Sequence, residues 1–276
     1  MKTVDDPVTH YDRITGAWRY LLGEDFHFGY FRAEDKSLDA ATDNLTTLMA
    51  ESGAIGPDVS VLDVGCGIGN PACVLAQRFG CRVTGISTSR SGVEGARRRA
   101  QERGCSDRVS FSIADGMDNG LPEASFDRVW VLEASHLMPR KDVLLAECAR
   151  VLRPGGLVVL CDVILGRDLP LAEVLSRAQD FIHLHYAFGR AKMETLDTYR
   201  RLGDRVGLQA TKLMDISEQM FPTFAHWRSR LESHREEVRG LIGDDGLEHF
   251  LASCEILPAL WKQRVLGYGL IVAVKE

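Results

Sequence analysis

The chain has 276 residues, of which 45% are hydrophobic and 26% are charged, and its formal net charge is −6. A chain of this length can bury a sizeable core, and this composition is typical of a soluble globular protein. The negative balance argues against a nucleic-acid-binding surface, because neutralising phosphates requires a clustered excess of basic residues. The one basic cluster, Arg97–Arg99, has acidic neighbours and is expected to form a solvated helix face.

The seven cysteines are odd in number, and none has the Cys-x-x-Cys or His/Cys spacing of a metal site. We therefore expect reduced thiols, no bound metal and a cytoplasmic protein. Residues 1–7 contain no apolar targeting core, and no stretch approaches the roughly eighteen apolar residues of a membrane span. The sequence predicts no membrane partner.

Residues 8–53 are expected to be helical, because Leu38 and Leu45 belong to an apolar series at helical spacing that Gly53 ends. The stretch 18–31 is dense in aromatic side chains and contains two glycines, which does not fit a plain amphipathic helix. We interpret it as a lid that closes over a ligand.

Residues 61–69 read Val-Leu-Asp-Val-Gly-Cys-Gly-Ile-Gly, which predicts a buried strand that turns sharply into a helix. Gly65 and Gly67 allow positive φ and a close approach of the backbone to a ligand. Gly69 opens a helix whose free N–H groups suit an anionic group. Nicotinamide and flavin enzymes also begin with a glycine-rich loop. Here, however, the third glycine comes one residue sooner and Asp63 precedes the first.

Strands and helices then alternate up to residue 165, which predicts a parallel sheet with helices on both faces. The further strands of this region are expected within 83–87, 109–117, 126–133 and 157–162, with a helix over 144–151 that Pro-Gly-Gly ends. Two more strands, at 205–214 and 265–274, are expected to form an antiparallel hairpin at one edge. One or two helices are expected between them, over 217–262.

These motifs, in this order across about 100 residues, resemble those of class I S-adenosylmethionine (SAM)-dependent methyltransferases. The resemblance implies an α/β fold with a Rossmann-like, seven-stranded, mostly parallel sheet, helical lid insertions and SAM as the cofactor. It implies a single methyltransferase domain over 1–276. Its expected parts are an N-terminal helical lid (1–53), a SAM-binding core (54–165), an acceptor-covering helical insertion (166–206) and C-terminal strands and helices (207–276).

The resemblance also assigns residues to the cofactor. Asp63 is expected near the methionine end of SAM, and Asp115 is expected to accept from the adenine amine with Met117 against the ring. An ordinary turn role is the alternative for each aspartate. Ser87 and Thr88 stand where many members carry an acidic residue for the ribose, a departure that we interpret as a subfamily trait. The remaining residues expected around the cofactor are Gly65, Gly67, Gly69, Asn70, Gly116 and Leu132.

Two further stretches narrow the subfamily. Residues 25–31, Asp-Phe-His-Phe-Gly-Tyr-Phe, and residues 133–139, Glu-Ala-Ser-His-Leu-Met-Pro, resemble elements of bacterial small-molecule methyltransferases. This group includes the rebeccamycin sugar O-methyltransferase and geranyl diphosphate C-methyltransferases. The resemblance implies that Tyr30 covers the SAM carboxylate. The family often carries a His pair, and Leu137 replaces its second member here.

His136 follows the fourth strand, where the SAM methyl group is expected to emerge, and its imidazole could take a proton from an acceptor hydroxyl. Asp162 could orient that ring or bind substrate, and Tyr20 is expected to face the acceptor. A purely structural His136 is the alternative. The aromatic residues of 181–189, with Tyr199 beyond them, are expected either to pack in the core or lid or to line a pocket for a flat or isoprenoid acceptor.

The sequence therefore predicts a SAM-dependent methyltransferase that acts on a small, largely apolar secondary metabolite. O-methylation with His136 as base is favoured, because a base and its orienter are both present. The first alternative is C-methylation of a prenyl alkene, with a cation that aromatic faces could stabilise. The second is a methyltransferase-like protein that keeps SAM and catalyses another reaction. No nucleic-acid partner is expected, and a homo-oligomer is left open.

Overall fold

The computed structural model describes residues 7–23 and 25–276, and it describes side chains from Ile14 onward within those ranges. The expectation for residues 1–7 therefore lies largely outside the described residues, whereas most of the segment 8–53 is described and contains two helices. The chain forms two compact units. Unit 1 comprises the described residues up to Leu45 together with 164–195 and 216–268, and unit 2 comprises 46–163, 196–215 and 269–276.

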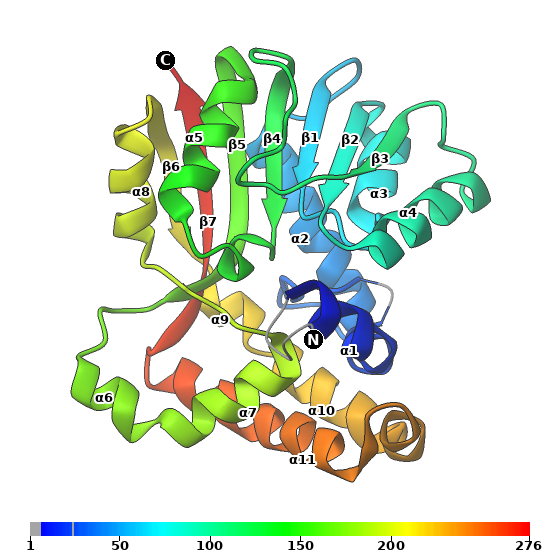
Figure 1. The fold of residues 1–276 in the computed structure, drawn as a ribbon, viewed down its shortest axis with the longest axis vertical. Coiled ribbons are helices and arrows are strands. Elements are labelled where there is room, and N and C mark those ends of the chain that lie inside the picture. Colours follow the sequence, from blue (N-terminus) through cyan, green and yellow to red (C-terminus); the bar gives the residue numbers. More distant parts are fainter. Residues whose placement is uncertain (1–6, 24) are drawn as a thin grey trace. The chain divides into compact units, whose positions relative to one another are not determined.

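A seven-stranded sheet organises unit 2, with strand order β3-β2-β1-β4-β5-β7-β6 (Figure 1). The strands are β1 (Ser60–Val64), β2 (Arg82–Ser87), β3 (Val109–Ile113), β4 (Phe126–Leu132), β5 (Leu152–Leu165), β6 (Leu208–Asp215) and β7 (Leu266–Lys275). The pairings of β1 with β2 and β4, of β2 with β3 and of β4 with β5 are parallel, while β6 and β7 pair antiparallel. The predicted α/β, mostly parallel architecture is confirmed.

The register fixes where a ligand can lie. Asp63 of β1 is paired with Gly85 of β2 on one side and with Trp130 of β4 on the other. The chain order runs outward from β1 in both directions, so the loops after β1 and β4 diverge. Ligands of open parallel sheets bind at the carboxyl ends of the strands beside such a switch in strand order.

Helices cover both faces of this sheet because parallel crossovers are right-handed, and the crossovers from β1 to β3 run along the sheet in the opposite direction to the crossover from β4 to β5. The crossover helices on the β2 side, α3 (Asn70–Phe79) and α4 (Arg90–Glu102), contact each other. On the β5 side, α5 (Lys141–Val151) contacts α8 (Leu196–Asp204). The C-terminal part of α2 (Leu38–Ser52) also belongs to unit 2.

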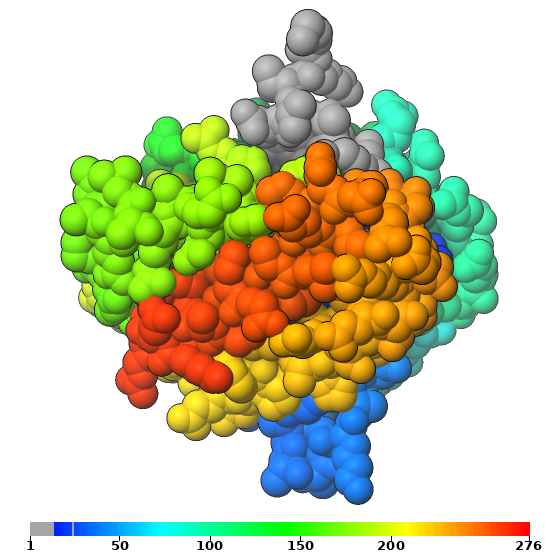
Figure 2. Space-filling model, turned by 90° about the horizontal axis from the view of Figure 1, so that it is seen from below, coloured from blue at the N-terminus to red at the C-terminus, as the bar shows by residue number. Residues whose placement is uncertain are grey.

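Unit 1 is helical. It contains α1 (Pro7–Leu22), α6 (Leu171–Ser176), α7 (Ala178–Phe188), α9 (Ser217–Met220), α10 (Thr223–Ser233) and α11 (Arg235–Lys262). Figure 2 shows α11, in orange, beside α7, in green, and these two helices make the most extensive helix contact of the unit. No helix of the described residues is long and apolar enough to cross a membrane.

An aromatic cluster forms the core of unit 1. Phe28 is 4% exposed, and its ring centroid lies 4.5 Å from that of Trp227 and 5.4 Å from those of Phe224, Trp261 and Tyr268. These residues come from the N-terminal segment, α10, α11 and the start of β7. Part of the stretch that we interpreted as a lid is therefore core, and its closure over a ligand stays a prediction.

Two expected boundaries were wrong. Residues 217–262 form three helices instead of one or two, because Pro222, which has no N–H, caps α10 and the backbone leaves the helical conformation at His234. The last of them, α11, also contains a non-helical residue, Gly243. Strand β5 begins at Leu152 and continues to Leu165, so Asp162 lies inside this strand instead of at its end. The division into units also crosses the expected insertion 166–206, since α8 belongs to unit 2.

We predict that Phe28→Ala lowers the free energy of unfolding by about 3–5 kcal/mol, because truncating a buried ring removes its transfer free energy and leaves a cavity. Denaturant unfolding measures the loss. Ile182→Ala is the matched control in the same unit, since Ile182 is 53% exposed and should cost little. Equal losses in the two variants would contradict the assignment of Phe28 to the core.

Candidate active site

The loop after β1 has the conformation that its glycines predict. Gly65, Gly67 and Gly69 have φ values of 83°, 51° and 77°, in the left-handed region that side chains avoid. The loop is held to β2 by hydrogen bonds from the N–H groups of Gly65 and Cys66 to the carbonyl of Ile86, at 2.9 and 3.0 Å. Gly69 then caps α3. The loop therefore presents bare backbone at the carboxyl edge of the sheet.

Asp63 supplies a charge that nothing in the described structure satisfies fully. Its side chain is 3% exposed, and its Oδ2 has no hydrogen-bond partner. Burial raises the pKa of this carboxyl from 3.8 to about 7. An orphaned, buried carboxylate oxygen beside a glycine loop is suited to a ligand ammonium group, so the residues present fit the amino-acid end of SAM.

Cys66 lies in the same loop and is 5% exposed. Burial, with the nearby Asp63 carboxylate as a second cause, raises the pKa of its thiol well above 9.0. The thiol is therefore protonated at neutral pH. All seven cysteines are buried and free in the structure.

Other residues predicted for the cofactor follow the neighbouring strands. Asp115, after β3, is exposed, and its Oδ1 accepts from the N–H of Met117 at 2.9 Å, which fixes the turn at this point. Gly116 is buried there, where a Cβ would lie 2.6 Å from Val64 Cγ1. Leu132 ends β4 and is 8% exposed. All of these residues lie at or beside the carboxyl edge, and their contacts with a cofactor stay predictions.

Ser87, Thr88 and Asn70 also lie near this edge. Ser87 Oγ accepts from the N–H of Ser89 at 3.2 Å, while Thr88 is exposed. Asn70 begins α3, is 4% exposed and accepts through Oδ1 from Arg99 at 3.0 Å. The basic cluster is thus only partly a solvated face, since Arg99 is tied to the start of α3.

His136 lies on a short 3₁₀ turn, Ser135–Leu137, that follows β4. The chain enters the turn through Glu133, whose φ of 47° is unusual for a residue with a side chain and is typical of constrained functional segments. Lys141, 2% exposed, donates to the carbonyls of Ser135 at 2.6 Å and Met138 at 2.5 Å. These bonds close the turn and fix the ring that it carries.

The Asp162 side chain is completely buried and holds this turn from β5. Its Oδ1 accepts from His136 Nδ1 at 2.7 Å and from the N–H of Val163 at 2.7 Å. Its Oδ2 accepts from Ser135 Oγ at 2.5 Å and from the N–H of His136 at 2.9 Å. Because Nδ1 of His136 donates to a carboxylate, Nε2 is the nitrogen of the ring that can take a proton.

The electrostatics of the pair follow from this contact. Burial opposes the charged imidazole, but the adjacent Asp162 carboxylate outweighs it and raises the pKa of His136 above 6.5. Burial likewise opposes the charged carboxylate of Asp162. The attraction and hydrogen bonds from His136, together with the hydrogen bond from Ser135, outweigh burial and lower the pKa of Asp162 below 3.8. Asp162 is therefore ionised, and its negative charge stabilises the imidazolium form of His136.

Sequence reasoning missed Ser135 and Lys141 of this cluster, and it placed Tyr199 only in the segment that was expected to cover the acceptor. Tyr199, 2% exposed on α8, has its Oη 2.7 Å from Ser135 Oγ. Ser135 and Lys141 are neighbours of His136 in sequence, but neither belongs to a pattern of its own. The contact of Tyr199 with Ser135 has no sequence signal, because the packing of α8 brings the two residues together.

Tyr20 and Tyr30 belong to unit 1. The ring of Tyr20 lies 5.3 Å from that of His234, and the backbone of Tyr30 is tied to α2 through its N–H and Ala41 at 2.8 Å. Their proposed roles toward acceptor and cofactor stay predictions. Among the described residues, no group of three or more His, Cys, Asp or Glu could hold a metal ion.

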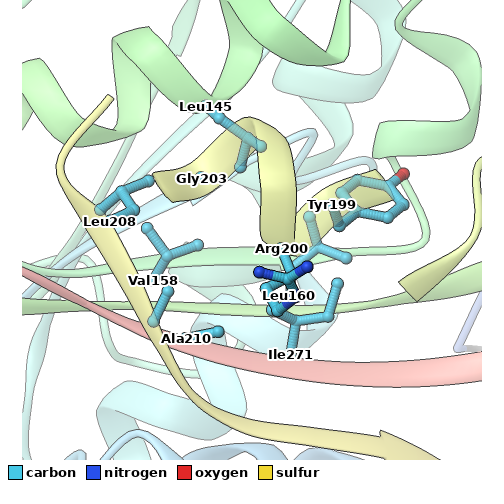
Figure 3. Close-up of a pocket in the computed structure, with 10 residues that line it drawn as sticks. Leu145, Val158, Leu160, Tyr199, Arg200, Gly203, Leu208, Ala210 and Ile271 are labelled. Atoms are coloured by element: carbon cyan, nitrogen blue, oxygen red, sulfur yellow. The ribbon is translucent and has the colours of Figure 1, made fainter. Parts of the chain in front are cut away.

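A small pocket in unit 2 lies between α5, α8 and the sheet (Figure 3). Its lining is largely apolar and includes Leu145, Leu160, Tyr199 and Ile271. Its volume of about 10 Å³ is roughly that needed for one water molecule. The pocket is therefore too small for an organic acceptor.

The buried Asp63 carboxyl makes stability depend on pH. Its pKa is about 7 in the folded chain and 3.8 is its ordinary value, so the folded protein binds the extra proton between these values. The stability that this proton contributes to the fold is fully present below pH 3.8. It is lost as the pH rises toward 7, which lowers the free energy of unfolding by about 4 kcal/mol. We predict that Asp63→Asn removes this loss and makes the ligand-free protein more stable at pH 8, while weakening SAM binding.

Thermal unfolding between pH 5 and pH 8, and titration calorimetry with SAM, measure the two effects. Asp142→Asn is the control, since its exposed carboxyl pairs with Arg140, which lowers its pKa to about 2, outside this range. A variant at Asp63 with unchanged stability at pH 8 and unchanged SAM affinity would refute both assignments.

We predict that Gly67→Val abolishes binding of SAM and of S-adenosylhomocysteine, because a branched side chain would occupy the bare backbone of the loop. The wild-type protein should bind both and should not bind NAD. Gly104→Val is the matched control: Gly104 has a φ of 64° and open space around it, so it carries similar strain without lying in the loop. Normal binding by Gly67→Val in calorimetry would exclude the glycine loop as the site.

The comparisons with known proteins agree with this geometry. A methyltransferase domain model matches residues 62–160. Methyltransferase GfsG of Streptomyces halstedii is 36% identical over 217 residues, which cover 78% of this chain and 76% of that protein. The 27-O-demethylrifamycin SV methyltransferase of Amycolatopsis mediterranei is 34% identical over 265 residues, which cover 96% and 95%.

Among solved structures, the [4+2]-cyclase SpnF has a TM-score of 0.82 at 26% identity, over 97% of this chain and 95% of that one. The family model spans the loop after β1 and continues to β5, so it covers the strands that carry the candidate cofactor residues. Together, these matches and the fold show that the chain belongs to the class I SAM-dependent methyltransferases, with SAM as its cofactor.

Proposed function

We propose that the protein methylates a hydroxyl group of a small, largely apolar secondary metabolite, with His136 as the general base and Asp162 as its orienter. One observation carries this proposal: Nδ1 of His136 and Oδ1 of Asp162 are 2.7 Å apart, directly after β4 and within β5. Parallel pairing of Leu132 with Cys161 sets this juxtaposition, because it aligns the residues that follow on the two strands.

SAM, when bound, supplies the electrophilic methyl group. Asp162 keeps the proton of His136 on Nδ1, so Nε2 carries a lone pair for the acceptor proton. As the hydroxyl oxygen becomes a nucleophile, Nε2 takes its proton and the ring becomes an imidazolium. The buried Asp162 carboxylate stabilises that cation, which agrees with the raised pKa of His136. Lys141 fixes the turn, so the base is positioned before the acceptor arrives.

The names of related proteins support this acceptor class. The relative from Amycolatopsis is named as a methyltransferase of 27-O-demethylrifamycin SV. A relative from Aspergillus sclerotiorum, whose match to this chain covers 97% of that protein, is named O-methyltransferase resE. These names favour an oxygen acceptor over a prenyl carbon. The similarity to SpnF, named as a [4+2]-cyclase, supports a second candidate, in which the same fold catalyses a cyclisation without methyl transfer.

We predict that His136→Ala lowers turnover about a hundredfold or more, the usual contribution of a positioned base. SAM affinity should change little. Part of the lost rate should return at high pH, where the acceptor hydroxyl ionises unaided. In the wild-type enzyme, activity should fall as the pH drops below the raised pKa of His136, because the ring is then already protonated.

The assay begins with 27-O-demethylrifamycin SV and related hydroxylated metabolites as acceptors, with isotopically labelled SAM as donor. Label on oxygen in the product supports the proposal, and label on carbon supports the prenyl alternative. If methylation is on carbon, His136→Ala keeps most methyl transfer but changes the mixture of products. Full activity with one unchanged product would leave His136 a structural residue. A cyclised, unlabelled product would support the SpnF-like candidate.

A further inference from the structure

A buried hydrogen-bond chain extends from the candidate base to a different element of the fold. Ser135 is fully buried, and its Oγ lies 2.5 Å from Asp162 Oδ2 and 2.7 Å from Tyr199 Oη. Tyr199 is 2% exposed and comes from α8. In Figure 3 its hydroxyl points away from Leu208 and Val158, which line the small pocket.

Proton counting fixes the direction of this chain. The ionised Asp162 carboxylate has no proton, so it accepts from each of its neighbours. Ser135 has one hydroxyl proton and donates it to Asp162 Oδ2. The remaining contact, between Ser135 Oγ and Tyr199 Oη, must then use the proton of Tyr199. Tyr199 donates to Ser135, Ser135 donates to Asp162, and His136 Nδ1 donates to the other oxygen of the same carboxylate.

We propose that Tyr199 is a positioning residue for methyl transfer, which acts through Ser135 to hold the Asp162 carboxylate against Nδ1 of His136. The inference rests on the proposed function, since it assumes that His136 is the base. Within the described part of the chain, the oriented hydroxyl of Ser135 is one of four donors to Asp162, and the other side-chain donor is His136. Tyr199 prevents this hydroxyl from turning to another acceptor.

The chain also sets how readily the base is protonated. Donors to a carboxylate stabilise its charge most when no cation is beside it, which is the state with neutral His136. Removing the Tyr199 hydroxyl weakens the bond from Ser135, because bonds in series polarise one another. The state with neutral His136 then loses more stabilisation of the Asp162 carboxylate than the state with the imidazolium does. The ring should therefore be protonated more easily, and less free base should remain at neutral pH.

The test uses the full-length chain and Tyr199→Phe, which removes one hydroxyl and keeps the ring. NMR titration of the ligand-free protein follows the imidazole of His136, identified among the eight histidines by its absence from the spectrum of His136→Ala. We expect its midpoint to rise by about half a pH unit. The acid limb of the kcat/KM profile should move in the same direction, with activity recovering at high pH.

Two further variants separate positioning from packing. Tyr268→Phe removes a hydroxyl from a tyrosine with no exposed surface in unit 1 and should leave the midpoint unchanged. Ser135→Ala should raise the midpoint as Tyr199→Phe does, and the double variant should match Ser135→Ala, because the chain is already broken. If Tyr199→Phe does not fold, Tyr199→Leu, which also lacks the hydroxyl, tests the same link.

No shift in Tyr199→Phe beyond that of the Tyr268 control would overturn the inference, even if His136 proves essential for turnover. An effect of Tyr199→Phe that persists in full in the Ser135→Ala background would also overturn it, since Tyr199 would then act by another route. A shift in Tyr199→Phe combined with full activity of His136→Ala would keep the hydrogen-bond chain and reject the proposed function instead.

Discussion

Taking a carboxylate out of water is costly unless donors replace the lost hydration, and Asp162 has no exposed surface. Four donors surround it, two from side chains and two from the backbone. Hydrogen bonds to this carboxylate fix the position of the turn after β4, the orientation of the His136 ring and the direction of the Ser135 hydroxyl. The protonation of the candidate base depends on the same charge.

The opposite situation occurs on β1, which β4 separates from β5. Asp63 is almost as buried as Asp162, but one of its oxygens has no partner, and its pKa is raised instead of lowered. A carboxylate that serves an internal catalytic contact can be satisfied by the fold itself. One that waits for a ligand cannot, so the ligand-free chain carries its cost. The contrast between the aspartates of β1 and β5 distinguishes the candidate catalytic part of the edge from the proposed cofactor part.

Local patterns predicted much of this fold. The apolar run before Asp63, the three glycines and the alternation of strands and helices gave the sheet and its carboxyl edge, because each depends on residues close in sequence. His136 and Asp162 could be proposed because His136 was expected to follow the fourth strand and Asp162 was expected to end the fifth. Tyr199 could not, because its approach to Ser135 depends on how α8 packs against α5. The number of helices after residue 217 was also wrong, since Pro222 and the non-helical backbone at His234 divide an otherwise continuous helical pattern.

Cys66 illustrates a problem that any protein faces when it holds an alkylating agent. The glycine loop that is proposed to lie along the cofactor contains a sulfur atom, and a thiolate there would be a strong nucleophile toward a sulfonium methyl group. Burial and the nearby Asp63 carboxylate keep that sulfur protonated, and a thiol is a poor nucleophile. The same low-polarity surroundings that make the loop costly to charge therefore protect it from self-methylation.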